Sequence, residues 1–195
     1  LSLLKDLEKQ VITFGLGLDV GIPDLEPRVT PLQLRGLEKD DFAFQLASIV
    51  VWIGYLQWKV KNGYAPAAET PILKPLDTIK QMDSILNLPV SYSEGVRAQA
   101  IPRHLRLADV RPKYYGTPSE PEWPAADVIV GNPPFLGGNK IRAELSDEYV
   151  DALFKLYEGR VPAFSDLCCY WFEKARAMIA EGKAKRTGLL ATQGI

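Results

Sequence analysis

The sequence predicts an α/β fold with a mostly parallel sheet and flanking helices. Short runs rich in β-branched residues alternate with longer segments of helical periodicity, a pattern typical of strand–helix–strand units. Three expected strands end on a polar side chain, namely Glu38, Asp83 and Asn132. Because parallel sheets bind ligands beyond the carboxyl ends of their strands, this recurrence predicts a site at that edge. The 195 residues, 47% of them hydrophobic, suffice for one domain with a core.

The first expected elements are an amphipathic helix and a short strand. Residues 1–14 place an apolar stripe on one helical face: Leu3, Leu4, Leu7, Val11 and Ile12. The stretch "PLQLRGL", residues 31–37, is predicted to be a short strand that ends on Glu38.

A long helix and a second strand follow. Residues 40–60 predict a largely buried helix that begins at Asp40 or Asp41. Its apolar stripe comprises Phe42, Leu46, Ile49, Val50 and Ile53. A short strand is expected at residues 79–82, directly before Asp83.

The second half begins with an irregular, proline-rich excursion over about residues 88–124. A buried strand is expected at 127–131, and helices at 146–157 and 166–183, the latter with Gly182 as its C-cap. The stretch "RTGLLATQGI" closes the chain as an apolar strand.

Composition and charge limit the classes of protein. The formal net charge of -1 gives no global signature of nucleic-acid binding, and basic residues between 97 and 113 are more ordinarily a solvated surface than phosphate contacts. The two adjacent cysteines, Cys168 and Cys169, cannot form a disulfide framework, which favours a reducing, cytoplasmic setting. No apolar run is long enough to span a bilayer, so no membrane partner is expected.

The stretch "VGNPPF" is the most specific feature of the sequence. A strand at 127–131 ends on Asn132, Pro133, Pro134 and Phe135, which we call the ledge. Two consecutive prolines remove two backbone donors and fix two φ angles, so they favour a rigid projection over a hairpin turn. A proline-rich turn with Phe135 as core filler is the alternative.

The ledge has the groups needed to activate an aromatic amine. The side-chain oxygen of Asn132 and the backbone carbonyl of Pro133 can each accept one N–H of such an amine. Its nitrogen lone pair then turns from the ring towards an electrophile, and the fixed carbonyl provides preorganisation. Phe135 can stack on a base taken out of a duplex.

Two acids at strand ends indicate an adenosine-containing cofactor, although each has a simpler explanation. Glu38 can accept both hydroxyls of a ribose, and Asp83 can accept the exocyclic amine of an adenine. Taken singly, Glu38 is as consistent with a surface acid, and Asp83 with a turn or N-cap residue.

The chain resembles the DNA methyltransferases that use S-adenosylmethionine to modify adenine N6. More closely, "VGNPPFLGGNKIR", "DEYVDALFKLYEGRVPAFSDLCCYWFEKA" and "GLLATQGI" resemble the methylase domain of MmeI-type restriction-modification enzymes. Upstream, "LRGLEKDDFAFQLASIVVWIGYLQW" and "TIKQMDSIL" are similar to the segments that carry the ribose-binding and adenine-binding acids.

The resemblance implies a Rossmann-like class I methyltransferase fold and a role for each motif residue. Asn132, Pro133 and Phe135 would bind and activate the flipped adenine, with Pro134 shaping the loop. Glu38 and Asp83 would hold S-adenosylmethionine, DNA would be the partner, and no metal is implied. Cytosine C5 methylation would need a nucleophilic cysteine, whereas Cys168 and Cys169 lie mid-helix among aromatic residues, which favours a buried structural role.

The chain departs from the family pattern in its cofactor-binding loop. The glycine-rich loop after the family's first strand is missing, and the chain begins with Leu1 and ends with Ile195. We therefore expect residues 1–195 to be a partial catalytic domain, with the first and last strands, target-recognition region and any nuclease elsewhere in the full-length protein. A sheet without its central strand must re-pair or stay split. The isolated chain is thus expected to bind cofactor poorly.

Three alternative functions remain open from the sequence. One is methylation of RNA or of a protein glutamine, which uses the same Asn-Pro-Pro ledge, usually with Tyr in place of Phe135. A second is a non-catalytic remnant of a DNA methyltransferase. A third is a nucleotide-binding regulator that uses Glu38 and Asp83 and leaves the ledge unexplained.

Overall fold

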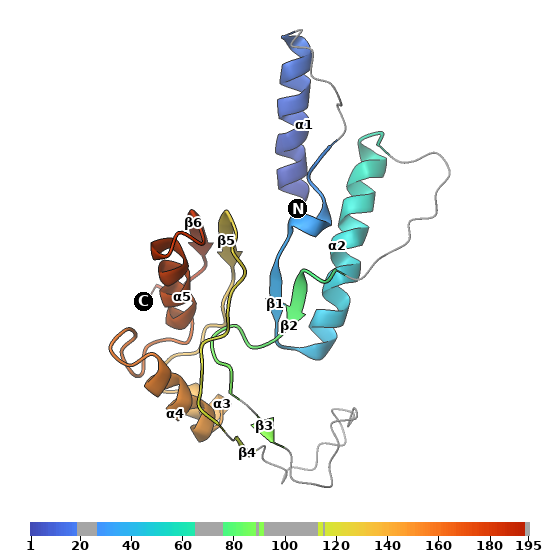
Figure 1. Ribbon diagram of the computed structural model, residues 1–195. Helices are drawn as coiled ribbons and strands as arrows, with labels where there is room; N and C mark the ends of the chain where they lie inside the picture. The colour runs from blue at the N-terminus through green and yellow to red at the C-terminus, as the bar shows by residue number, and fades with distance from the viewer. Residues whose placement is uncertain (19–26, 65–75, 89, 92–112, 115, 194–195) are drawn as a thin grey trace. The chain divides into compact units, whose positions relative to one another are not determined.

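The structure is a computed structural model that describes residues 1–18, 27–64, 76–88, 90–91, 113–114 and 116–193 (Figure 1). The chain forms two compact units, Leu1–Met82 and Asp83–Ile195. Among the described residues, each unit contains one pair of parallel strands. Within the described ranges, no helix is long and apolar enough to cross a membrane.

The first unit is a strand–helix–strand arrangement preceded by a helix. Its elements are α1 (Ser2–Gly17), the 3-10 turn η1 (Pro31–Gln33), β1 (Gly36–Glu38), α2 (Asp41–Lys61) and β2 (Ile79–Gln81). The two strands are parallel, with Gly36 opposite Ile79 and Glu38 opposite Gln81. This is the parallel strand pairing that the sequence predicts for this half of the chain.

A buried lysine joins α1 to α2. Lys5 is fully buried, and its ammonium group donates a hydrogen bond to the carbonyl of Val29 at 2.8 Å. The same group lies 4.3 Å from the ring centroid of Trp58, whose indole N–H donates to Asp6 Oδ1 at 2.7 Å. The apolar stripe predicted for α1 is therefore mostly exposed, and a cation–π contact and one indole–carboxylate hydrogen bond join α1 to α2 instead.

The helix predicted at residues 40–60 is confirmed as α2, but the prediction that this helix is largely buried is wrong. Asp40 is its N-cap and accepts a hydrogen bond from the Ala43 amide at 3.0 Å. The predicted apolar stripe is exposed, with relative exposures of 72% for Phe42, 42% for Leu46, 45% for Ile49, 56% for Val50 and 44% for Ile53. Trp58 is the buried residue of the helix. The reason is that a unit with a two-stranded sheet has too little apolar surface to cover a helix of 21 residues.

The strand expected at residues 31–37 is shorter and begins later. Pro31–Gln33 form a 3-10 turn, in which the Gln33 side chain accepts the Thr30 amide at 2.7 Å. Proline at the first position and this reciprocal cap favour a helical turn over an extended chain. Strand pairing therefore starts only at Gly36.

The described part of the second unit contains the other parallel pair and three helices. Its elements are β3 (Val90–Ser91), β4 (Lys113–Tyr114), β5 (Val128–Gly131), α3 (Ile141–Glu144), α4 (Asp147–Leu156), α5 (Cys169–Ala180) and β6 (Arg186–Leu189). β3 and β4 are antiparallel, whereas β5 and β6 are parallel, with Gly131 opposite Leu189. The strand predicted before the ledge is present as β5, but the prediction that it is buried is wrong: Val128 is 54% and Val130 78% exposed, because a two-stranded sheet covers little of its own surface. The basic residues between positions 97 and 112, within the proline-rich excursion, lie outside the described residues.

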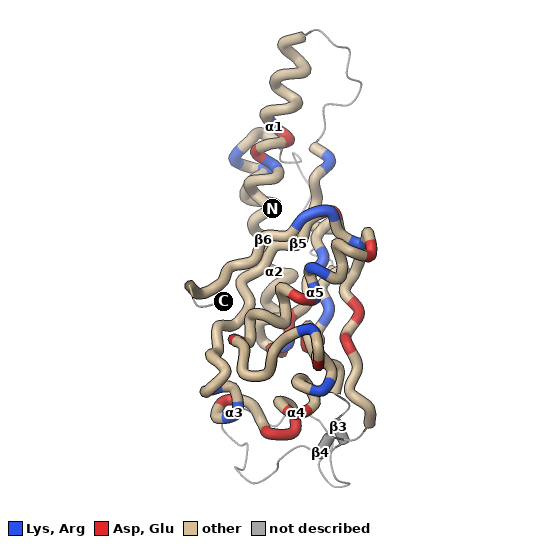
Figure 2. The backbone as a smooth tube through the Cα atoms, turned by 90° about the vertical axis from the view of Figure 1, so that its left-hand side faces the viewer, with Lys and Arg blue, Asp and Glu red and all other residues tan. Residues whose placement is uncertain are grey.

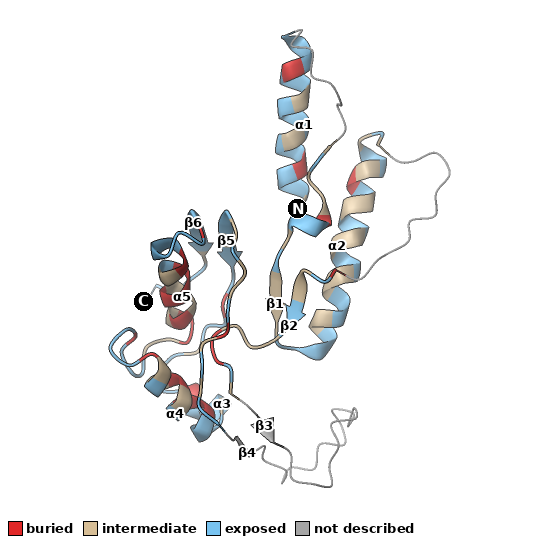
Figure 3. Cartoon of the chain, viewed as in Figure 1, coloured by how far each residue is buried: buried red, intermediate tan, exposed pale blue. Residues whose placement is uncertain are grey.

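The core of the second unit lies between α4, α5 and the segment after Asp83 (Figure 3). Its buried cluster comprises Ile85, Leu86, Ile141, Tyr149, Val150, Leu153, Tyr157, Val161, Leu167 and Tyr170. Ser146 caps α4 by accepting the Tyr149 amide at 3.2 Å, and Gly182 follows α5, as predicted, with a φ of 70°. These caps fix the helices that bury the aromatic residues.

Two tyrosines in this core give a matched test of hydrogen bonding. Their rings pack edge to face at 5.0 Å, and both are fully buried. The Tyr157 hydroxyl donates to the Ile85 carbonyl at 2.9 Å, whereas no described residue partners the Tyr170 hydroxyl. Tyr157→Phe leaves a buried carbonyl unsatisfied and is expected to lower the free energy of unfolding by about 1–3 kcal/mol.

Tyr170→Phe is the control, because it removes a hydroxyl that has no partner among the described residues. Its unfolding free energy should stay within about 0.5 kcal/mol of the wild-type value or rise. Urea denaturation of both variants measures the difference. Equal losses in the two variants would contradict the assignment of the hydrogen bond.

Candidate functional site

The ledge lies at the carboxyl end of a parallel strand. β5 pairs with β6 as far as Gly131, whose carbonyl accepts the Leu190 amide at 3.1 Å. Asn132 and Pro134 are exposed, Pro133 is buried, and Phe135 is 46% exposed. No described residue donates to the Asn132 side-chain oxygen or to the Pro133 carbonyl. The ledge therefore projects an amide and an aromatic ring from a fixed strand end.

Leu136, the residue after the ledge, is hydrogen-bonded to a loop that is distant in sequence and that the sequence pattern did not predict. The backbone of Leu136 makes hydrogen bonds with Asp166 and Leu167. We call residues 162–168 the clamp loop. The glycine pair at 137–138 is a sequence signal for such a close approach of two backbones, although it does not identify the partner.

Glu38 is the last residue of β1 and precedes the N-terminus of α2. Its side chain is half-buried, and Oε1 accepts the Asp40 amide at 2.8 Å. Its carbonyl accepts the Met82 amide at 2.8 Å. The carboxylate is thus held at a strand end, as the sequence predicts, and it belongs to the first unit.

Asp83 opens the second unit and organises the turn that follows it. Oδ1 accepts the amides of Ile85 and Leu86 at 3.0 and 3.2 Å, and Oδ2 accepts the Tyr149 hydroxyl at 2.8 Å. The turn-forming role that the sequence left open for Asp83 is therefore present. Its carboxylate is also oriented by a tyrosine from α4.

The prediction that the two cysteines lie mid-helix is wrong, because α5 begins at Cys169, but both have the environment of structural residues. Cys168 is fully buried, and desolvation raises the pKa of its thiol to about 12. Cys169 is half-buried, and desolvation also raises its pKa. Since the thiolate is the nucleophilic form, neither residue is primed for nucleophilic catalysis. The described residues contain no group of His, Cys, Asp and Glu side chains that could hold a metal ion.

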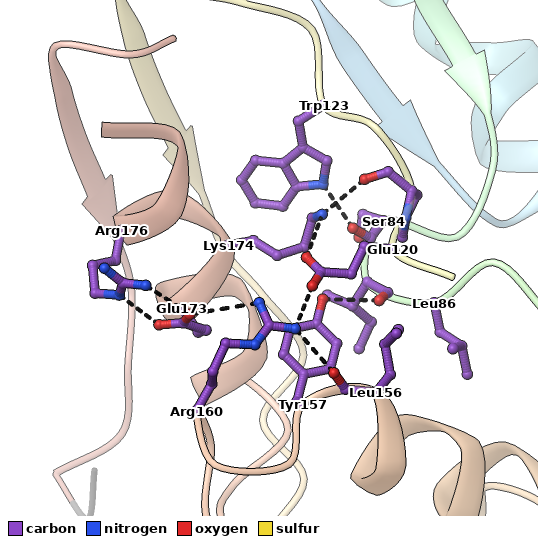
Figure 4. Close-up of polar contacts among 12 residues, drawn as sticks. Ser84, Leu86, Glu120, Trp123, Leu156, Tyr157, Arg160, Glu173, Lys174 and Arg176 are labelled. Carbon is purple, nitrogen blue, oxygen red and sulfur yellow. Dashed lines mark hydrogen bonds and ion pairs between the residues drawn. The ribbon is translucent and has the colours of Figure 1, made fainter. Parts of the chain in front are cut away.

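A partly buried ionic network fixes the segment that leads into β5 (Figure 4). Lys174 donates to the Pro121 carbonyl at 2.7 Å and lies 3.4 Å from Glu120, which also pairs with Arg160. Burial lowers the pKa of Lys174, and Glu120 partly opposes that shift. The indole N–H of Trp123 donates to the Ser84 carbonyl at 2.6 Å. Residues 120–123 are thereby tied to both α5 and the turn after Asp83.

Acidic and basic residues are mixed along α5 and the segment that connects it to β6, and the basic ones are in excess (Figure 2). Glu173 pairs with Arg176 at 2.6 Å, and Lys185 pairs with Asp127 at 2.6 Å. These pairs neutralise part of the charge locally within the second unit.

Comparison with known families identifies the class of protein. The family model described as "MmeI, DNA-methyltransferase domain" matches residues 2–195. The chain therefore belongs to the MmeI DNA-methyltransferase domain family, which confirms the resemblance seen in the sequence. No curated protein and no solved structure matched the chain. Membership of this family implies DNA as the substrate.

Proposed function

We propose that the chain carries the machinery for moving a methyl group from S-adenosylmethionine to the N6 amine of a flipped adenine in DNA, within a restriction-modification system. The observation that carries this proposal is the ledge: Asn132 and Phe135 project from the end of a parallel strand, and Pro133 is buried between them. Family membership supplies the substrate class, and the ledge supplies the reason for choosing an exocyclic amine.

The ledge residues act on the amine through hydrogen bonding and stacking. The Asn132 side-chain oxygen and the Pro133 carbonyl accept the two N–H bonds of the N6 amine, which directs its lone pair out of conjugation with the ring. The buried proline holds its carbonyl in place, so little reorganisation is needed when charge develops on nitrogen. The half-exposed ring of Phe135 provides a stacking face for the extruded base.

The two strand-end acids fit the polar groups of S-adenosylmethionine to different extents. Glu38 has one oxygen committed to the Asp40 amide, which orients the other for a ribose hydroxyl. Asp83 accepts at least three hydrogen bonds within the second unit, so its fit to the cofactor adenine is the weaker of the two. When bound, S-adenosylmethionine would supply an electrophilic methyl group: the N–C bond to the amine would form in line as the C–S bond breaks, which leaves S-adenosylhomocysteine and releases one amine proton. The protein contributes by positioning.

The proposal includes a Rossmann-like class I arrangement of the sheet. Its support is that both described pairs of longer strands are parallel and that each pair is connected through helices, α2 in the first unit and α3 to α5 in the second. Such connections are typical of doubly wound sheets.

Product analysis tests the proposed function. The full-length gene product is incubated with methyl-tritiated S-adenosylmethionine and unmethylated genomic DNA, total RNA or protein extract, and the labelled products are digested and separated. We expect the label in N6-methyladenine from DNA, and about 10²- to 10³-fold slower labelling with the Asn132→Ala variant. Label in RNA or in protein glutamine would overturn the substrate assignment. Cofactor binding without any labelling would favour a non-catalytic remnant.

A further inference from the structure

The backbone immediately after the ledge is held from both sides by the clamp loop. The Leu136 amide donates to Asp166 Oδ1 at 3.3 Å, and the Leu136 carbonyl accepts the Leu167 amide at 2.9 Å. Both polar groups of one peptide residue thus bond to a segment about thirty positions away in sequence. This arrangement fixes the exit of the ledge, as the β5–β6 pairing fixes its entrance at Gly131.

Asp166 is itself well fixed at the start of α5. Its Oδ1 also accepts the Cys168 amide at 3.1 Å, and its carbonyl accepts the Cys169 amide at 3.0 Å. Leu167 and Cys168 are buried in the core of the unit. A carboxylate anchored in this way can transmit the rigidity of the core to Leu136.

A second contact between the same two segments is steric. A Cβ atom on Gly138 would lie 1.7 Å from the Phe164 carbonyl oxygen, so the two backbones approach as closely as glycine allows. Phe164 has a φ of 67°, a conformation that turns usually give to glycine or asparagine. Its ring contacts Phe154 at 5.6 Å, which helps to hold that turn in place. Strained backbone that persists at an exposed position is typical of functional sites.

We infer that Asp166 is a positioning residue for methyl transfer, which holds Leu136 and thereby sets the direction of Asn132 and Phe135. The role rests on the proposed function. Asp166 acts through the Leu136 backbone and does not touch the reacting atoms. This role requires a hydrogen-bond acceptor oxygen on the side chain of residue 166, and it does not require a negative charge.

The test compares Asp166→Ala with Asp166→Asn in the full-length protein. Asp166→Ala removes the acceptor, and we expect kcat for methylation of genomic DNA to fall about 10- to 100-fold because the ledge is misplaced. The Kd for S-adenosylmethionine, measured by calorimetry, should change less than about twofold. Asp166→Asn keeps an acceptor oxygen, so its kcat should remain within about threefold of the wild-type value. Glu181→Ala, an exposed acid at the end of α5, is the control and should leave both constants unchanged.

Each other outcome overturns the positioning role. An Asp166→Ala protein with wild-type kcat and a lower melting temperature would show that Asp166 is only structural. Two results together would show that charge or folding matters and not the acceptor. The first is that Asp166→Ala loses cofactor binding or fails to fold, and the second is that Asp166→Asn loses kcat to the same extent. Failure of the wild-type protein to label adenine would instead overturn the proposed function, so the two failures are distinguishable.

Discussion

Substitution of Asn132 by alanine in the full-length protein is expected to lower the rate of methyl transfer about 10²- to 10³-fold while leaving cofactor binding nearly unchanged. The side-chain oxygen is one of two acceptors proposed to hold the amine, and the exposed position of Asn132 means that its removal opens no core cavity. The expected size is that of deleting one preorganised hydrogen-bonding group from an active site. Single-turnover rates with tritiated cofactor, and cofactor binding by calorimetry, measure the two quantities separately.

Asn139→Ala is the matched control for this experiment. Asn139 is also exposed and lies only seven positions further along the chain, beyond the ledge. Its substitution should leave the rate within about twofold of wild type, as surface changes usually do. If Asn132→Ala retained more than about a tenth of the wild-type rate, the ledge would not be the group that activates the amine.

Local signals in the sequence predicted the helices well. The caps at Asp40 and Ser146 are short-range features, because each side chain accepts an amide three residues along the chain. The same reasoning failed for the apolar stripe of α2, whose exposure depends on how much apolar surface the rest of its unit offers. Periodicity gives the face of a helix, and it does not give the partner that covers it.

The candidate site shows the same division between local and long-range information. The ledge was recognisable because strand, amide, two prolines and aromatic ring are contiguous. Asp166 was not recognisable, because its partner Leu136 is 30 positions away in sequence. The hydrogen bond also uses a backbone amide, which nearly any residue provides. The bonds from Asp83 to Ile85 and Leu86 are local, whereas its bond to Tyr149 spans 66 positions. Sequence reasoning therefore found the residues proposed to meet the substrate and missed those that hold them.

Gly138→Ala is expected to give the largest effect on stability near the site. The added Cβ would lie 1.7 Å from the Phe164 carbonyl oxygen, 2.3 Å from its carbonyl carbon and 2.6 Å from its Cα. All three are backbone atoms, so no change of rotamer relieves the clash and the ledge exit must move away from the clamp loop. We expect a loss of about 3 kcal/mol in the free energy of unfolding, at the upper end of the usual range for overpacking. Methylation should fall with it, because Leu136 lies between Gly138 and the ledge.

The neighbouring glycine separates this clash from the general cost of replacing glycine. A Cβ on Gly137 would meet no atom within 4 Å, so Gly137→Ala should change the free energy of unfolding by less than about 1 kcal/mol. Urea denaturation and methylation assays on both variants make the comparison. If the two alanine variants behaved alike, the contact between Gly138 and Phe164 would not hold the ledge. If only Gly138→Ala lost both stability and activity, the rigidity of the ledge would depend on a loop that carries none of the proposed substrate-binding groups.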